Sequence, residues 1–370
     1  MAKKRIIVAA ISSRAYVQAA IHAGFEVIAI DAFADVDTQK YAKQVLQAPI
    51  KNGQFEANAF LKVLQKIDLK KYIGLCYGAG FELQPNFLTE IARLIPIIGN
   101  APQTVQSCKN PQSLAKFCKL NHIATPIIAF SRPTDPIGWL QKEIGGSGGA
   151  HIKAVLALEI PKNLTLYYQK IQAGIPYSCL FLADEKNSQV IGYNEQWCNS
   201  SAVLPYRFGG AVSHADLSEN VKATITEFIA KATLFFGLKG INSCDFLLHE
   251  NKVYMLEINP RLSASLQLYS AKKCDLFAAH MQACVGELKQ WPTVEKQAKA
   301  MHIVYANKTA NVPADMPTKV PANMDWPDWV CDIPQPNSEI AAGAPICTVL
   351  ADARIAKLAR KKVMQRVALL

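Results

Sequence analysis

The sequence lacks several patterns that would assign the protein to a familiar class. Its ten cysteines form no Cys-X-X-Cys pair, and most lie inside apolar runs. This spacing argues against a zinc site and favours buried, reduced thiols over a disulfide framework. No apolar run approaches the roughly 20 residues of a membrane-spanning helix, and no basic–aromatic pattern typical of nucleic-acid-binding proteins is present. We therefore expect a cytoplasmic protein that binds neither membranes nor nucleic acids.

Two common nucleotide-binding motifs are also missing. Residues 5–10 form an apolar run, followed by a helical segment and by a second apolar run that ends at Asp31. This order predicts a βαβ unit, and Asp31 stands where such units can place a ribose-binding acid. The loop after the first run, ISSRAY, lacks the glycines that let a pyrophosphate approach the backbone. The P-loop pattern is absent too, so we expect a Rossmann-like domain that does not bind a dinucleotide.

The composition is that of a globular protein with a positive net charge. The chain has 370 residues, 50% hydrophobic and 19% charged, with a formal net charge of +11. This length is typical of two or three domains, and a positive field suits anionic substrates such as nucleotides. The basic residues are scattered except at 354–366. We interpret that segment as the solvated face of a helix over 351–367, not as a binding arm.

The most informative stretch is residues 243–261, which read SCDFLLHENKVYMLEINPR. Two apolar runs, 244–248 and 253–258, flank a polar break at 249–252. Apolar runs of this length around a short polar connection predict a β-hairpin.

Three side chains of this hairpin are candidate metal ligands: Asp245, Glu257 and Asn259. Glu257 and Asn259 are two residues apart and therefore share one face of their strand. By the same alternation, Val253 and Met255 are expected on the face of Glu257. The opposite face is expected to carry Tyr254, Leu256 and Ile258. Two carboxylates and an amide oxygen on one face suit a hard cation such as Mg²⁺. Asp245 reaches that face only if the loop at 249–252 has an odd number of residues or contains a bulge. The alternative is an edge hairpin with solvated acids.

A glycine-rich segment is the second candidate for phosphate binding. Gly146, Ser147, Gly148 and Gly149 follow a strand predicted over 139–144, and their backbone NH groups can surround phosphates. Lys142, on that strand, adds a positive charge. Flexible connectors have the same composition, so the glycines alone do not settle the function.

Several other polar residues have two interpretations. Glu82 follows a strand predicted over 72–77, at an edge where open α/β sheets bind ligands, so it either contacts substrate or belongs to a turn. Ser263 and Ser265 either line an acceptor site or cap the next helix. His151 either polarises a substrate or is a surface residue, and Arg207 lies in a polar segment, 195–215, without a recognisable motif.

The remaining pattern predicts a mixed α/β (α+β) protein of three units. A Rossmann-like domain covers 1–100 and a central nucleotide-binding domain covers 101–290. Long helices are predicted over 219–236 and 266–285. From residue 301, short apolar runs separated by proline and glycine predict a small β-rich unit at 291–370 with a terminal basic helix.

The order of these parts resembles the ATP-grasp superfamily of carboxylate–amine ligases over nearly the whole chain. The matching motifs are Lys109-Asn110, Lys142 before the glycines, QKIQAG at 169–174, and CDF…LEINPR at 244–261. The hairpin resembles the magnesium-binding hairpin of D-alanine–D-alanine ligase and of biotin carboxylase. The branch that looks most similar is that of predicted ATP-dependent carboligases related to biotin carboxylase.

The resemblance implies a nucleotide site and its residues. Asp245, Glu257 and Asn259 would hold one or two Mg²⁺ ions on ATP, with Mn²⁺ as a substitute. Phosphates or the adenine edge would contact Lys109 and Lys142, under a lid at Gly146–Gly149. The adenine would lie against Gln169, Lys170 and Ile171, and Arg261 would stabilise the transferred phosphoryl group, with Lys142 beside it as a catalytic charge. Two residues depart from the family pattern, Glu143 in place of proline and Lys170 in place of an acid.

The implied activity is ATP-dependent ligation of a small-molecule acid to an amine through an acyl phosphate, releasing ADP and phosphate. Relatives of this kind are associated with one-carbon carrier cofactors such as methanofuran and tetrahydromethanopterin, and a homodimer is the expected assembly. Two alternatives stay open: a nucleotide-binding regulatory or assembly protein without turnover, and a biotin-carboxylase-like carboxylase. The chain has no Ala-Met-Lys-Met biotin-attachment sequence, so in the second case a partner would carry the biotin.

Overall fold

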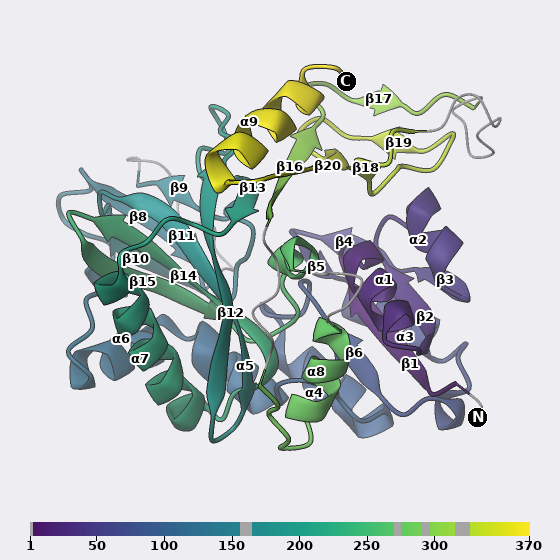
Figure 1. The fold of residues 1–370 in the computed structure, drawn as a ribbon, viewed down its shortest axis with the longest axis horizontal. Helices are drawn as coiled ribbons and strands as arrows, with labels where there is room; N and C mark the ends of the chain where they lie inside the picture. The colour runs from purple at the N-terminus through teal and green to yellow at the C-terminus, as the bar shows by residue number, and fades with distance from the viewer. Residues whose placement is uncertain (1–2, 156–164, 270–274, 291–296, 315–325) are drawn as a thin grey trace.

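The computed structural model describes residues 3–155, 165–269, 275–290, 297–314 and 326–370. Its elements form an N-terminal parallel sheet, a small antiparallel sheet and a long antiparallel sheet that runs on into the C-terminal strands (Figure 1). No helix in these ranges is both long and apolar enough to cross a membrane.

The N-terminal sheet has the strand order β3-β2-β1-β6, and all its strands are parallel. Alternate residues of β1 face opposite sides, so Ile6 and Val8 pack with α1 and α8 while Ile7 and Ala9 pack with α3 and α4. Both faces are therefore buried, as the continuous apolar runs predicted. Its elements are β1 Arg5–Ala10, α1 Arg14–His22, β2 Glu26–Asp31, α2 Val36–Tyr41, β3 Gln44–Gln47, β4 Ile50–Lys51, β5 Gln54–Phe55, α3 Ala57–Leu64, η1 Leu69–Lys71, β6 Leu75–Tyr77 and α4 Pro85–Leu94.

Asp31 ends β2 without facing a ligand site. Its buried carboxylate accepts hydrogen bonds from the backbone nitrogen and the hydroxyl of Ser13, both at 2.6 Å, and from the nitrogens of Phe33 and Ala34. These four donors occupy both carboxylate oxygens. The role of Asp31 is therefore to hold the loop after β1.

Two helices lead from this sheet to the small one, whose strand order is β7-β10-β8-β9. The side chain of Asn110 accepts hydrogen bonds from Gln112 and Ser113 and so caps the helix that Pro111 begins. The elements are α5 Pro102–Lys109, α6 Pro111–Leu120, β7 Ile128–Ala129, β8 Trp139–Glu143, β9 Lys153–Ala154 and β10 Leu166–Lys170.

The long sheet has the order β15-β14-β11-β12-β13-β16-β20-β18. Helix α7 packs on it through an apolar core with Phe228 and Phe236, and α9 packs on the C-terminal strands β16 and β20 (Figure 1). The elements are β11 Ile175–Asp184, β12 Ser188–Cys198, β13 Phe208–Ser213, α7 Glu219–Phe236, β14 Lys239–His249, β15 Lys252–Asn259, η2 Ala264–Leu268, α8 Leu276–Ala283, β16 Ala298–Tyr305, β18 Val330–Cys331, β20 Pro345–Ala353 and α9 Ala356–Val367, with β17 Ala310–Asn311 and β19 Glu339–Ile340 as a separate pair.

Three expectations about the later segments are modified. The helix predicted over 266–285 is split between η2 and α8, with 270–274 outside the described residues. The helix predicted over 351–367 starts only at Ala356, because β20 pairs with β16 as far as Ala353. The C-terminal strands extend the long sheet through β13, and the proposed boundaries at 100 and 290 stay predictions.

Candidate active site

The hairpin of β14 and β15 brings the candidate metal ligands together through a bulge. Its turn is the two-residue pair Glu250-Asn251, with φ angles of 50° and 64°. Continued without a break, this register would place Asp245 opposite Leu256. The register instead shifts between Asp245 and Phe246, so that Asp245 pairs with Glu257 and Leu256 is the extra residue. The prediction that a bulge or an odd loop is needed to bring Asp245 opposite Glu257 is confirmed, but its place was wrong, because the bulge lies in β15 at Leu256 and not in the connection at 249–252.

The same bulge makes one expectation wrong. An extra residue reverses the alternation of side chains along β15. Val253 and Met255 therefore pack in the core with Ile258 and not beside Glu257. Leu256 and Glu257 both line the cleft beneath the glycine-rich segment.

The polar groups of the hairpin form one connected cluster. The amide nitrogen of Asn259 donates to Asp245 Oδ2 at 2.9 Å and to Glu257 Oε1 at 3.3 Å. Lys109 Nζ, at the end of α5, donates to Glu257 Oε2 at 3.0 Å and to Asn259 Oδ1 at 2.6 Å. Gln196 Nε2, from β12, donates to Asp245 Oδ1 at 3.2 Å. An ammonium thus occupies the space between the oxygens of two candidate ligands.

The electrostatics of the cluster call for a cation. Burial and the neighbouring Glu257 carboxylate raise the pKa of Asp245 to about 7. Burial would also raise the pKa of Glu257, but the positive charges of Lys109 and Lys142 outweigh it and lower that pKa. Two carboxylates and an amide oxygen are hard donors that fit Mg²⁺. Among the described residues no group of three His, Cys, Asp or Glu side chains is placed to hold a metal, so an ion here would need the amide of Asn259 and phosphate oxygens.

The glycine-rich segment is packed tightly at two of its glycines. A Cβ on Gly149, whose φ is +76°, would lie 1.9 Å from the carbonyl oxygen of Tyr206. A Cβ on Gly146 would lie 2.3 Å from the ring of His151. Side chains are therefore excluded at both positions. Gly148, with φ +68°, has open space around it, and Ser147 is half-buried.

The two strands beside this segment supply the next residues. Lys142, on β8, is buried and donates to Gln169 Oε1, on β10, at 3.2 Å. Gln169 lines the cleft together with Lys109, Glu257 and Gly146. Lys170 and Ile171 are exposed at the end of β10 and are not among the lining residues. The adenine contact expected of them stays a prediction.

His151 and Arg207 have different surroundings. His151 lines the cleft, and burial together with Lys142 lowers its pKa to about 4, so its imidazole is neutral. Its Nδ1 is buried and makes no hydrogen bond with the residues that the structure describes. Arg207 instead donates to the carbonyl oxygens of Asn199 and Gly343, and its guanidinium lies 3.7 Å from the Tyr305 ring centroid. Arg207 therefore joins two loops outside the cleft.

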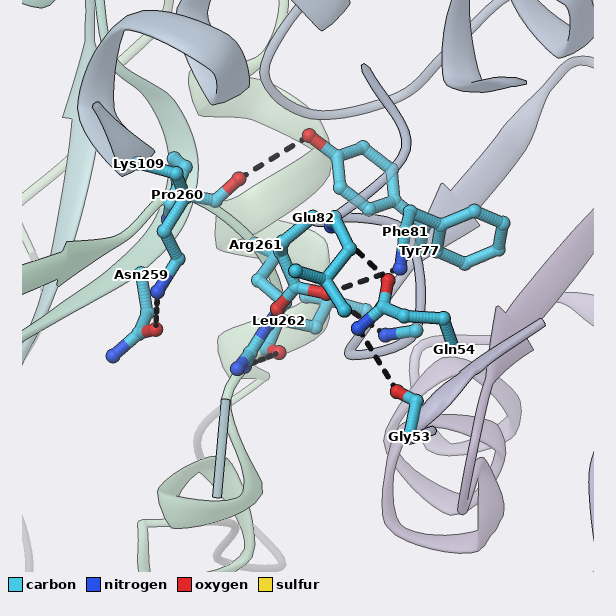
Figure 2. A network of polar contacts seen from close by, with 12 residues as sticks. Gly53, Gln54, Tyr77, Phe81, Glu82, Lys109, Asn259, Pro260, Arg261 and Leu262 are labelled. Atoms are coloured by element: carbon cyan, nitrogen blue, oxygen red, sulfur yellow. Dashed lines mark hydrogen bonds and ion pairs between the residues drawn. The ribbon is translucent and has the colours of Figure 1, made fainter. Parts of the chain in front are cut away.

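Arg261 lies just beyond the cluster, at the end of β15. It forms a buried ion pair with Glu82, and its Nη1 donates to the carbonyl oxygen of Leu262 (Figure 2). Ser263 accepts a hydrogen bond from Ser265 N at the start of η2, which supports the capping interpretation.

Two contacts of the site were not predicted from the sequence. One is the hydrogen bond from Gln196 to Asp245, and the other is the ion pair of Glu82 with Arg261. Gln196 follows Asn194 at a spacing of two, which in a strand marks one polar face and was a usable signal. Glu82 and Arg261 are 179 positions apart, and no local pattern links them.

A larger cavity, of about 830 Å³, lies between α1, η2 and the C-terminal strands. Its lining includes Arg14, Lys299, Asp328 and Asp352. Charges of both signs face this space, so its lining does not indicate one class of ligand.

Comparisons with known proteins identify the domain and the fold that contain these residues. Residues 110–265 match the family model described as ATP-grasp domain. An uncharacterized protein of Methanocaldococcus jannaschii is 23% identical over 366 residues, covering 95% of this chain and 89% of that protein.

Two solved structures share the fold. An L-amino acid ligase of Bacillus licheniformis has a TM-score of 0.71 at 12% identity, with 98% of this chain and 97% of that chain covered. A biotin carboxylase of Campylobacter jejuni, determined as a β-γ-ATP complex, has a TM-score of 0.70 at 16% identity, with 97% and 89% covered.

The match at 110–265 includes the glycine-rich segment, the hairpin and all the cleft-lining residues except Cys108 and Lys109, and the whole chain shares the fold of these enzymes. ATP and Mg²⁺ are the cofactors used by enzymes with this domain. Residues 110–265 therefore match an ATP-grasp domain, and the chain as a whole has the fold of ATP-dependent ligases and carboxylases that contain this domain.

Proposed function

We propose that this protein joins a small-molecule carboxylic acid to an amine at the expense of ATP. The observation that carries the proposal is the cluster of Asp245, Glu257 and Asn259, closed by Lys109. Glu257 and Lys109 line the cleft together with Gly146 of the glycine-rich segment. This arrangement supports the proposal because candidate cation ligands, positive side chains and a glycine-rich backbone lie close together.

The chemistry has two steps. A carboxylate oxygen of the acid attacks the γ-phosphorus of ATP, the bond to the bridging oxygen breaks, and ADP and an acyl phosphate form. The amine nitrogen then attacks the acyl carbon, phosphate leaves and the nitrogen loses a proton. Because neither step needs a covalent nucleophile on the protein, its contribution is positioning and charge neutralisation.

The residues of the cluster have separate roles in this proposal. Asp245, Glu257 and Asn259 would hold Mg²⁺, which when bound neutralises charge on the phosphate oxygens. Lys109 would leave Glu257 and Asn259 and turn to the phosphates. Lys142, already buried beside the cleft, would offset the remaining negative charge.

The cleft has to open before a nucleotide enters. In the described conformation the water-accessible space between its lining residues is about 30 Å³, which is room for only a few water molecules. Movement of residues 146–149 away from Glu257 would admit ATP, and their return would exclude water. Exclusion matters because an acyl phosphate hydrolyses when water reaches it.

For the substrates, the resemblance to carboligases associated with one-carbon carrier cofactors suggests precursors of methanofuran and tetrahydromethanopterin as the first acids and amines to test. A carboxylase that uses bicarbonate is the second candidate, favoured by the fold shared with biotin carboxylase. A homodimer and a role for Mn²⁺ also stay proposals.

A thermal-shift screen tests the function. The protein is incubated with Mg·ATP and pairs of acids and amines, and stabilising pairs are analysed for ADP and product mass. The proposal expects ADP formation that requires both an acid and an amine. Bicarbonate-dependent ADP formation without an amine would support the carboxylase, whereas nucleotide binding without turnover would support a regulatory protein.

A further inference from the structure

Glu82 is a buried carboxylate with both oxygens occupied. It lies in the turn after β6, and its side chain has no exposed surface. Its Oε2 accepts hydrogen bonds from the backbone nitrogens of Gly80 at 2.9 Å and Phe81 at 3.0 Å. Its Oε1 accepts the Nε–H of Arg261. Both oxygens of this carboxylate are therefore taken up by the protein in the described conformation, and a substrate contact by Glu82 stays a prediction.

Arg261 is held from one side and leaves the other side of its guanidinium available. Nε donates to Glu82, and Nη1 donates to the carbonyl oxygen of Leu262 at 3.1 Å. Nη2 makes no hydrogen bond with any residue that the structure describes. The side chain is 10% exposed and follows the candidate metal ligand Asn259 by two residues. A planar guanidinium fixed along one edge presents its remaining N–H groups to an anion.

The backbone around Arg261 is tied to the N-terminal domain. Tyr77 Oη donates to the carbonyl oxygen of Pro260 at 3.2 Å, and Leu262 N donates to the carbonyl oxygen of Tyr77 at 3.2 Å (Figure 2). Tyr16 Oη donates to the carbonyl oxygen of Leu262 at 3.3 Å. These bonds fix the segment 260–262, so the direction of the Arg261 side chain depends on Glu82.

Glu82 also touches the base of the glycine-rich segment. A Cβ on Gly145 would lie 2.5 Å from the carbonyl oxygen of Glu82 and 3.0 Å from Leu83 Cα. One residue of the N-terminal domain therefore contacts the start of the lid through its backbone and Arg261 through its side chain.

We propose that Glu82 is a positioning residue, which holds Arg261 so that its free N–H groups face the phosphoryl group being transferred. This inference rests on the proposed function, because it assumes a nucleotide in the cleft. An amide cannot replace this carboxylate, since both oxygens accept hydrogen bonds and an NH₂ group would meet another donor. The competing view is that the pair only stabilises the domain contact.

The test measures recognition of the γ-phosphoryl group separately from nucleotide binding. Dissociation constants are determined by calorimetry for Mg·ADP and for the Mg complex of β,γ-imido-ATP. The dissociation constant of Mg·ADP divided by that of the imido-ATP complex reports how much the γ-phosphoryl group contributes to binding. We expect Arg261→Met and Glu82→Gln each to reduce this ratio by about 10- to 100-fold, as measured for residues that orient functional groups. Binding of Mg·ADP should change little, and the double variant should lose no more than either single variant.

Gln54→Leu is the matched control. Gln54 Oε1 accepts a hydrogen bond from Leu83 N beside Glu82, and its Nε2 donates to the carbonyl oxygen of Gly53 (Figure 2), so neither of these hydrogen bonds involves Arg261. The Gln54→Leu variant should have a lower melting temperature, while its ratio of the two dissociation constants should equal that of the unmodified protein. If Glu82→Gln does not fold, Glu82→Asp is measured in its place. This variant keeps the negative charge but has a side chain shorter by one methylene, so its carboxylate lies further from Arg261. We expect its ratio to fall by less than that of Glu82→Gln.

The outcomes separate two failures. A Glu82 variant that keeps the ratio, while Arg261→Met loses it, would overturn the positioning role alone. Additive losses in the double variant would also overturn it. No binding of Mg·ADP by the unmodified protein, or an unchanged ratio in Arg261→Met, would contradict the proposed nucleotide site and the role of Glu82 with it.

Discussion

Replacing Lys109 with methionine should strengthen the binding of Mg²⁺ in the absence of nucleotide and weaken the binding of Mg·ATP. Lys109 Nζ lies 3.0 Å from Glu257 Oε2 and 2.6 Å from Asn259 Oδ1, with 4% of its side chain exposed. It therefore competes with a metal ion for the same oxygens. When ATP is bound, the same ammonium would contact phosphates. Removing it should therefore weaken the binding of Mg·ATP, although it strengthens the binding of Mg²⁺ alone.

The magnitude follows from these distances. Coulomb's law at 3.0 Å and an effective dielectric constant of 20 gives a gross attraction of about 5.5 kcal/mol between Lys109 and Glu257. Desolvation of the ammonium offsets much of this, and Glu257 is 29% exposed. The net contribution of a hydrogen bond to a charged group is about 1.5–3 kcal/mol. Removing the competing ammonium should therefore tighten Mg²⁺ binding by about 10- to 100-fold.

Calorimetric titration of Mg²⁺ into the nucleotide-free variant and the unmodified protein measures this effect. Melting temperatures with and without Mg²⁺ provide a second readout, since a ligand stabilises the folded state that binds it. Lys231→Met is the control, because Lys231 pairs with Glu227 at 2.6 Å on an exposed surface where ion pairs contribute little. Unchanged or weaker Mg²⁺ binding in Lys109→Met would refute the idea that this ammonium occupies the metal ligands.

Two further predictions concern the lid and pH. Gly149→Ala should lower the melting temperature and the ATP affinity more than Gly148→Ala, because its Cβ would lie 1.9 Å from a backbone oxygen while Gly148 has open space; equal losses would mean that only the positive φ angle matters. Affinity for Mg²⁺ should fall by up to about tenfold per pH unit below about pH 7 and level off above it, because the pKa of Asp245 is raised to about 7 and the ion must displace its proton. A pH-independent affinity between pH 5 and pH 8 would contradict this assignment.

Local signals predicted the elements with clear ends. The helix expected over 219–236 has those bounds in the structure, because Ser218 caps its first turn and Gly237 adopts the left-handed conformation at its end. For Asp245 to join Glu257, the hairpin was expected to have an odd loop or a bulge in the connection at 249–252, and the structure has the bulge further along, in β15. Chemistry at one site thus predicted a backbone irregularity.

Long-range relations were beyond the sequence pattern. Apolar alternation shows that residues 345–353 form a strand but not that it pairs with β16 and so continues the long sheet. The same limit applies to Glu82, whose partner is 179 residues away. It also applies to Lys109, which was expected on phosphates and here contacts the oxygens of two candidate metal ligands.

The central claim is that the hairpin carboxylates hold the metal that makes ATP reactive. The most direct test is the rate of ADP formation from Mg·ATP by Glu257→Gln, with the acid and amine identified by the screen and with circular dichroism to confirm the fold. The metal's charge stabilisation is worth several kcal/mol, so the rate should fall by at least about 100-fold while the fold is retained. Turnover at the rate of the unmodified protein would contradict the metal assignment.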